Sequence, residues 1–336
     1  MTASGPGREA ELNGNTNTNG IVDASQPNQK YTYLAGINVT HSIAPAMHNF
    51  IAASLGLPWT FSAVECPTVE DMMKLFRAPT FAGGVVTMPY KKAVMAHLDE
   101  LDELATTLGA CNNVYLNSEG KLCGTNTDWR GVEGCLRNAT ANANANAVVT
   151  PKKPALIIGA GGASRAAVYA LFARLECNVI YIINRDDQEV ADLAADAKAY
   201  TTKTDFKQEL RLVHVKSVEQ AQTLEPPYYV VGTVPDFPPT TPKEIEARRI
   251  LEVFLQQPQQ PKGVLLDMCF KPRNTSTLKL GAKYGWTTVD GTKIIGHQIQ
   301  EQYRLWAGED AVAKLDVAGA WEVLEKAASE SKGINF

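Results

Sequence analysis

The sequence predicts an α/β protein of two domains, and three features support this. Continuous apolar runs alternate with segments of helical periodicity along most of the chain. The 336 residues are more than one hydrophobic core commonly organises. From residue 154 onward the strand-like runs are apolar throughout and are separated by helices, which indicates a parallel sheet covered on both faces.

The composition is that of an ordinary globular protein, with 45% hydrophobic and 20% charged residues. A formal net charge of −4 gives no electrostatic case for nucleic acid or an anionic membrane as partner. No apolar run approaches the ~18–20 residues of a membrane helix, and the N-terminus lacks a signal-peptide pattern. The 6 scattered cysteines, with no CxxC pair, predict reduced thiols, a cytoplasmic location and no metal site.

Residues 1–29 are rich in Asn, Thr, Gly and Ser and contain few apolar groups. Such a segment cannot bury enough surface to offset its ordering entropy, so it is predicted to be a disordered tail. The first domain is expected over residues 30–135, and Pro45 and Gly56 delimit its first helix. Its predicted elements are strands at 31–36, 60–66 and 82–88, helices at 45–56, 69–78 and 92–109, and a hairpin over 113–128.

Residues 136–153 are predicted to form a low-complexity connection, because the Ala- and Asn-rich stretch shows neither helical nor strand periodicity. The second domain is expected over residues 154–299. Its predicted elements are an apolar strand that runs from 154 into glycines, a helix at 164–175, a strand at 178–185, and further apolar strands at 228–234 and 263–269. Two last helices are expected at 294–308 and 311–328.

Gly159, Gly161 and Gly162 lie where the first apolar strand of this domain turns into a helix. Glycine lets the turn close tightly and lets the backbone approach a pyrophosphate, while the helix N-terminus supplies N–H donors. Ser164 replaces the third glycine of the GxGxxG pattern, but the flanking strand, helix and second strand are those of a Rossmann dinucleotide-binding domain. The alternative is a structural glycine turn that binds no nucleotide.

Four polar segments of the first domain precede this turn: HSIAPAMHN (41–49), GVVTMPYK (84–91), GACNNV (109–114) and GTNTD (124–128). In this order they resemble the shikimate/quinate dehydrogenase family, over roughly residues 33–330. The resemblance implies an N-terminal α/β substrate-binding domain, completed by about 300–336, and a C-terminal Rossmann domain. It also implies a nicotinamide cofactor, NAD or NADP.

Lys91 and Asp128 match the catalytic lysine and aspartate of that family. A lysine beside a carboxylate can be oriented to give or take the proton of an alcohol that becomes a ketone. Hydride leaves the same carbon for the nicotinamide. The neighbouring Lys92 is expected to be a solvated surface charge, and a purely structural role is the alternative for the pair.

The resemblance also implies a set of substrate-binding residues: Ser42, Ala44, Thr87, Asn112 and Gln298. The chain departs from the family pattern where Ala44 replaces the second of two serines, Val85 replaces an asparagine and Phe270 replaces a tyrosine. Loss of the serine hydroxyl makes room beside the carbon on which quinate carries an extra hydroxyl. This favours quinate slightly over shikimate, and a related alicyclic acid stays open.

The expected cofactor-binding residues are Gly159, Gly161, Gly162, Ala163, Ser164, Asn184, Arg185, Asp186 and Thr233. At the end of the second strand an acidic group usually holds the ribose diol, whereas an Arg accommodates a 2′-phosphate. The family's NADP sites typically read Asn-Arg-Thr with a further base, but Asp186, Asp187 and Glu189 follow Arg185 here. Like charges would repel the phosphate. NAD is therefore favoured over NADP, with Arg185 stacking on the adenine.

We therefore expect an NAD(P)-dependent dehydrogenase that interconverts shikimate or quinate and its 3-dehydro ketone. The alternative is a catalytically retired regulatory protein that senses the same acids, although retention of Lys91 and Asp128 argues against it. The expected partner is a small alicyclic hydroxy acid, with no nucleic acid and no membrane. The chain is expected to be a monomer or a homodimer.

Overall fold

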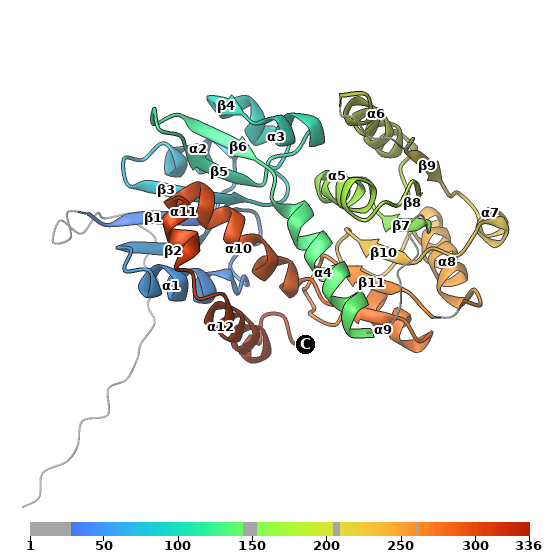
Figure 1. Ribbon diagram of the computed structural model, residues 1–336. Helices are drawn as coiled ribbons and strands as arrows, with labels where there is room; N and C mark the ends of the chain where they lie inside the picture. The colour runs from blue at the N-terminus through green and yellow to red at the C-terminus, as the bar shows by residue number, and fades with distance from the viewer. Residues whose placement is uncertain (1–27, 144–152, 204–208, 260) are drawn as a thin grey trace, which may run out of the picture.

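The computed structural model describes residues 28–143, 153–203, 209–259 and 261–336. The predicted tail at 1–29 therefore lies almost wholly outside the described residues, as does half of the predicted connection at 136–153. Two six-stranded sheets with helices around them form the two parts of the molecule (Figure 1). This arrangement is the α/β architecture that the sequence predicts.

The first sheet has the strand order β2-β1-β3-β5-β6-β4. Its strands are β1 (Lys30–Gly36), β2 (Trp59–Glu65), β3 (Phe81–Val86), β4 (Glu100–Leu101), β5 (Asn113–Leu116) and β6 (Leu122–Thr125). β1, β2 and β3 are parallel and are joined by α1 (Ala44–Ser54) and α2 (Val69–Phe76), whereas β5 and β6 form the predicted antiparallel hairpin. The carboxyl ends of β1 and β3 therefore meet at one edge of the sheet.

The predicted helix at 92–109 is wrong, because this segment is divided into three elements. A 3₁₀ turn, η1 (Ala93–His97), is followed by β4 and then by α3 (Glu103–Leu108). The short strand pairs with β6, and the backbone N–H of Asp99 donates to the carbonyl of Leu122 at 3.0 Å. Asp102 starts the new helix by accepting from the backbone N–H of Ala105 at 2.7 Å. Sheet pairing thus overrides the local helical preference.

The second sheet is entirely parallel, with the order β12-β11-β10-β7-β8-β9. Its strands are β7 (Ala155–Ile158), β8 (Val179–Ile183), β9 (Arg211–His214), β10 (Tyr229–Gly232), β11 (Val264–Asp267) and β12 (Thr287–Val289). Its helices are α5 (Gly162–Tyr169) with the π-helical turn η2 (Ala170–Arg174), α6 (Asp187–Lys203), α7 (Val218–Thr223), α8 (Pro242–Gln256) and α9 (Ser276–Lys283). This strand order is that of the Rossmann fold, which places ligands at the carboxyl ends of the strands.

Helix α4 (Asp128–Ala143) runs between the two sheets (Figure 1). It corrects the prediction that residues from 136 onward lack helical structure, because the helix continues for eight further residues. Thr140 is buried, its hydroxyl donates to the carbonyl of Leu136 at 2.8 Å, and the same oxygen lies 3.4 Å from Tyr229 Oη. Burial against the second domain therefore extends the helix into a sequence without apolar periodicity.

The last helices return to the first sheet. They are α10 (Thr292–Ala307), α11 (Glu309–Ala313) and α12 (Val317–Glu330), so the helix predicted at 311–328 is interrupted. Trp306 covers Gly83 of β3, and its indole N–H donates to the carbonyl of Val114 at 3.2 Å. Tyr303 donates its hydroxyl to the carbonyl of His48 at 2.9 Å. The limits predicted for the two domains stay a prediction.

Candidate active site

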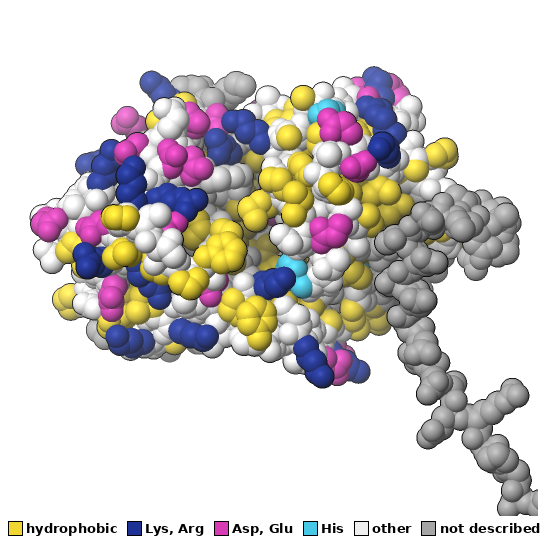
Figure 2. Space-filling model, turned by 180° about the vertical axis from the view of Figure 1, so that it is seen from behind, with side chains coloured by type: hydrophobic (Ala, Val, Ile, Leu, Met, Phe, Trp, Pro, Cys, Tyr) yellow, Lys and Arg dark blue, Asp and Glu magenta, His cyan; other side chains and the backbone are white. Residues whose placement is uncertain are grey.

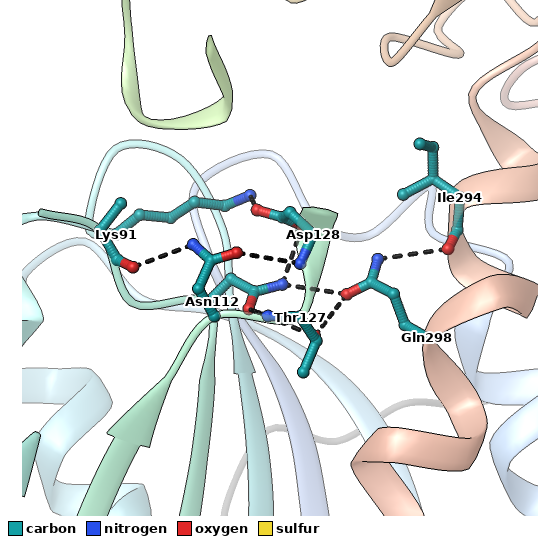
Figure 3. Close-up of polar contacts among 8 residues, drawn as sticks. Lys91, Asn112, Thr127, Asp128, Ile294 and Gln298 are labelled. Atoms are coloured by element: carbon teal, nitrogen blue, oxygen red, sulfur yellow. Dashed lines mark hydrogen bonds and ion pairs between the residues drawn. The ribbon is translucent and has the colours of Figure 1, made fainter. Parts of the chain in front are cut away.

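Lys91 and Asp128 form an ion pair at the carboxyl edge of the first sheet (Figure 3). Lys91 follows β3, and its carbonyl accepts the backbone N–H of Cys111 at 2.7 Å, which fixes the segment beside β5. Asp128 is the first residue of α4, where the helix dipole favours a carboxylate. The side chains are 16% and 6% exposed, so both charged groups are largely withdrawn from water. Lys92, by contrast, is exposed.

Asn112 connects this pair to the C-terminal helices (Figure 3). Its Nδ2 donates to Asp128 Oδ1 at 2.8 Å and to Gln298 Oε1 at 3.0 Å. Gln298 Oε1 also accepts the hydroxyl of Thr127 at 2.6 Å, and its Nε2 donates to the carbonyl of Ile294 at 3.2 Å. Asn112, Asp128 and Gln298, which were selected from separate motifs, therefore form one buried hydrogen-bond network.

Two members of this network were not among the predicted site residues. Asn126 donates to the carbonyl of Ala110 at 2.9 Å and accepts the backbone N–H of Asp128 at 3.0 Å. Thr127 donates its backbone N–H to Asn112 Oδ1 at 2.6 Å. Both residues stand in the segment GTNTD, so their proximity in sequence to Asp128 was the available signal. They hold the backbone at the start of α4, and with it Asp128, against the hairpin.

The other predicted substrate residues lie at the start of α1 and at the end of β3. Ser42 Oγ accepts the backbone N–H of Ala44 at 3.3 Å. Thr87 packs its methyl group against Gly36, where a Cβ would overlap it. Ala44 is buried in an apolar cluster against which Val85 and Phe270 also pack. The three departures from the family pattern thus contribute to one cluster, which makes this part of the site more apolar.

The glycine turn after β7 has the geometry that a dinucleotide phosphate requires. Gly159 has φ of +114°, and a Cβ there would overlap Thr233 Oγ1. A Cβ at Gly161 would meet nothing within 4 Å, so a phosphate has room to approach this backbone. Helix α5 begins at Gly162, with Ala163 half-buried in its first turn. The residues present therefore fit a dinucleotide pyrophosphate.

Ser164 takes a structural part in this turn. Its hydroxyl lies 2.8 Å from Thr233 Oγ1, which in turn donates to the carbonyl of Ile158 at 2.8 Å. The serine that replaces the third glycine thereby links α5 to the end of β10. Thr233, one of the predicted cofactor residues, closes the turn from the end of the neighbouring strand β10.

Asn184, Arg185 and Asp186, which follow β8, form contacts with α6 and α8 that were not expected from the sequence. Asp186 Oδ1 caps α6, since it accepts the backbone N–H of Gln188 at 2.8 Å and of Glu189 at 3.2 Å. Asn184 Nδ2 donates to Glu189 Oε2 at 2.8 Å. Arg185 forms an ion pair with Glu244, at the start of α8.

The Lys91–Asp128 pair and the glycine turn are adjacent. A Cβ added at Gly162 would lie 3.6 Å from Lys91 Cβ, an ordinary van der Waals distance. Exposed apolar side chains follow the carboxyl ends of three strands, namely Ile37, Met88 and Val234, which are 41%, 61% and 39% exposed. On the face in Figure 2, hydrophobic side chains gather toward the middle, between regions rich in charge.

Within the described ranges, no group of three or more His, Cys, Asp or Glu side chains is placed to hold a metal ion. The two histidines near the substrate residues are explained by packing. His48 is fully buried, stacks on Phe61 at 4.1 Å between ring centroids, and has its pKa lowered to about 3 by desolvation. His41 lies 5.8 Å from the ring of Phe270.

No helix among the described residues is long and apolar enough to cross a membrane.

Comparison with known proteins identifies the family of this chain. Residues 34–114 match the family described as shikimate dehydrogenase substrate binding domain. Quinate dehydrogenase from Emericella nidulans is 38% identical over 299 residues, which cover 84% of this chain and 89% of that protein. The segment that matches the family contains both Lys91 and Asn112.

Solved structures show the same fold. Shikimate 5-dehydrogenase from Thermus thermophilus, in complex with NADP(H) and shikimate, is 29% identical with a TM-score of 0.64, over 89% of this chain and 99% of that one. Shikimate 5-dehydrogenase from Listeria monocytogenes, in complex with shikimate and NAD, is 25% identical with a TM-score of 0.68, over 91% and 100%. The chain belongs to the shikimate/quinate dehydrogenase family of NAD(P)-dependent oxidoreductases.

Proposed function

We propose that this protein oxidises a ring hydroxyl of quinate or shikimate to the 3-dehydro ketone, and that Lys91 and Asp128 carry out the proton transfer. The observation that carries the proposal is the buried Lys91–Asp128 ion pair, which lies beside the glycine turn: a Cβ added at Gly162 would come within 3.6 Å of Lys91 Cβ. In this reaction the proton leaves the hydroxyl oxygen and the hydride leaves the carbon that bears it. The proton-transfer group and the hydride acceptor must therefore lie close together, and the position of Lys91 beside the glycine turn supports this arrangement.

The roles of the side chains follow from their contacts. In the oxidising direction Lys91, as the neutral amine, takes the hydroxyl proton; in the reducing direction its ammonium returns the proton to the carbonyl oxygen. Asp128 orients the lysine through Oδ2, while Asn112 occupies its Oδ1. A nicotinamide bound at the glycine turn supplies the hydride acceptor for the same carbon. Gln298 secures Asn112 from α10 and leaves one N–H of its amide for a substrate hydroxyl.

Ser42, Ala44 and Thr87 are proposed to surround the remainder of the substrate, and quinate is the favoured acid. Ala44 lacks a hydroxyl and lies in the same apolar cluster as Val85 and Phe270, so the pocket offers fewer polar contacts and more room. The relative from Emericella nidulans, whose name is quinate dehydrogenase, supports the same preference.

NAD is the favoured cofactor. Asp186 uses one carboxylate oxygen to cap α6, which leaves the other for a ribose diol. Its negative charge would repel a 2′-phosphate. The predicted cytoplasmic location and the monomeric or dimeric state stay predictions.

The decisive experiment crosses quinate and shikimate with NAD and NADP, following the absorbance of the reduced nicotinamide. We expect turnover with both acids, the highest efficiency with quinate and NAD, and strongly reduced turnover in Lys91→Ala. Binding of either acid without turnover under any combination would favour the regulatory alternative. Turnover that is highest with shikimate and NADP would overturn the finer assignments while leaving the dehydrogenase activity in place.

A further inference from the structure

Arg185 is the cationic side chain to which a ribose 2′-phosphate would bind, but it already forms an ion pair with Glu244. Arg185 follows β8, at the place where a Rossmann domain binds the adenosine ribose. Its guanidinium pairs with Glu244 Oε1, across 59 residues of sequence. The Arg185 side chain is 64% exposed but that of Glu244 is only 23% exposed. The carboxylate is therefore the more buried partner of this pair.

The second oxygen of Glu244 is anchored to its own helix. Oε2 accepts the backbone N–H of Thr241 at 2.9 Å and of Thr240 at 3.0 Å, and Thr241 in turn accepts the N–H of Glu244, which completes a capping box. These backbone donors, together with Arg185, lower the pKa of Glu244 to about 2. Glu244 is consequently a fixed and permanently charged partner at neutral pH.

A second base nearby is paired in the same way. A hollow of about 160 Å³ beside the ends of β8 and β9 is lined by charged side chains, among them Arg185, Asp187, Lys216, Lys243 and Glu246. Lys216 Nζ lies 2.5 Å from Asp187 Oδ1. The basic side chains that could attract a phosphate are thus present, but two of them are already neutralised by carboxylates.

We propose that Glu244 determines the discrimination against NADP by occupying Arg185, an inference that rests on the dinucleotide site of the proposed function. A 2′-phosphate must compete with a fixed carboxylate for the guanidinium, whereas the ribose diol of NAD needs no base. Glu244 is a positioning residue in this scheme, since it acts through Arg185. The acidic residues that follow β8 in the sequence account for only part of this selectivity.

The test uses Glu244→Gln in the full chain. Glutamine keeps an oxygen for the capping donors, so α8 should remain capped, but it turns an N–H toward Arg185 in place of a negative charge. Glu252→Gln, on the same helix but paired with Tyr284 Oη, is the matched control. Calorimetry would measure the dissociation constants of ADP-ribose and of its 2′-phosphorylated form, two probes that require no turnover.

In Glu244→Gln we expect the 2′-phosphorylated probe to bind about fivefold more tightly relative to ADP-ribose, the scale of an exposed ion pair. Glu252→Gln should leave the ratio unchanged. The gain should disappear when Arg185→Ala is added. An unchanged ratio with the melting temperature retained would overturn the proposal, and so would a gain that persists without Arg185. Because binding is measured, absence of turnover with quinate and shikimate would refute the proposed function without deciding this inference.

Discussion

Lys91 lies beside Gly162, since a Cβ placed on Gly162 would come within 3.6 Å of Lys91 Cβ. One residue follows β3 of the first sheet, and the other begins the helix of the dinucleotide turn. The residue proposed for proton transfer and the turn proposed for cofactor binding therefore lie close together, although they come from different sheets.

Lys91→Ala should lower kcat by about two to four orders of magnitude, because general acid–base catalysis contributes on that scale. KM for the acid should change far less, since the lysine acts on the reacting hydroxyl. Lys92→Ala removes the neighbouring exposed amine and is the matched control, expected to keep kcat. Near-normal kcat in Lys91→Ala would exclude Lys91 from the mechanism.

Gly161→Ala should raise KM for both cofactors and leave the melting temperature nearly unchanged. A methyl group at Gly161 meets nothing within 4 Å of the protein, but it occupies space that a pyrophosphate would need. Gly159→Ala should behave differently and destabilise the fold, because Gly159 has φ of +114° and no room beside Thr233. Thermal melts and cofactor titrations distinguish the two. A Gly161→Ala protein with unaltered KM would place the pyrophosphate elsewhere.

Ala44→Ser should shift the ratio of kcat/KM toward shikimate and away from quinate, by about tenfold, which corresponds to ~1.4 kcal/mol. A serine hydroxyl could donate to the substrate carboxylate, and it would occupy volume beside the extra hydroxyl of quinate. The measurement is the ratio of the two efficiencies in the wild type and the variant. If the ratio stays constant, Ala44 contributes only to the apolar cluster around α1, and the preference for quinate loses its main support.

Asp186→Ser should narrow the preference of the enzyme for NAD over NADP. Serine is also a good N-cap, so α6 should keep its start while the negative charge is removed. The comparison is kcat/KM for each cofactor with the same acid. Asp192→Ser, a change on the same helix outside the capping position, serves as the charge control. An equal loss of the preference for NAD in both variants would indicate a general effect of charge and no specific role for Asp186.

Stability should fall as pH rises from about 4 to about 6 because of Asp267, at the end of β11. Burial raises the pKa of this carboxyl from 3.8 to about 6, although Thr275 donates to it at 2.7 Å. The unfolded chain releases the proton first, so folding becomes less favourable across this interval and changes no further above it.

Asp267→Asn removes this titration. Denaturant unfolding of both proteins at about pH 4.5 and about pH 7 should show the variant gaining roughly 2 kcal/mol relative to the wild type between the two conditions. Parallel pH profiles would show that the pKa of the Asp267 carboxyl is not raised in the folded protein.

Much of the fold and of the site followed from local sequence. The apolar runs at β7, β8, β10 and β11 and the glycine turn predicted the second domain, because a buried parallel strand and a tight phosphate turn each restrict residue type locally. Local patterns failed where a partner distant in sequence decided the structure. Pairing of β4 with β6 divided a predicted helix, and contact of Thr140 with Tyr229 extended α4 beyond its expected end.

The sequence by itself determined which residues could carry the chemistry: Lys91, Asp128 and Asn112 each stand in a motif whose residue types suit proton transfer and its support. Only the tertiary structure decided which distant residue supports Asn112 and which carboxylate pairs with Arg185. Gln298 reaches Asn112 across 186 residues, and Glu244 reaches Arg185 across 59. The physical reason is that hydrogen bonds and ion pairs act over a few ångströms in space, whereas a motif reports only neighbours along the chain.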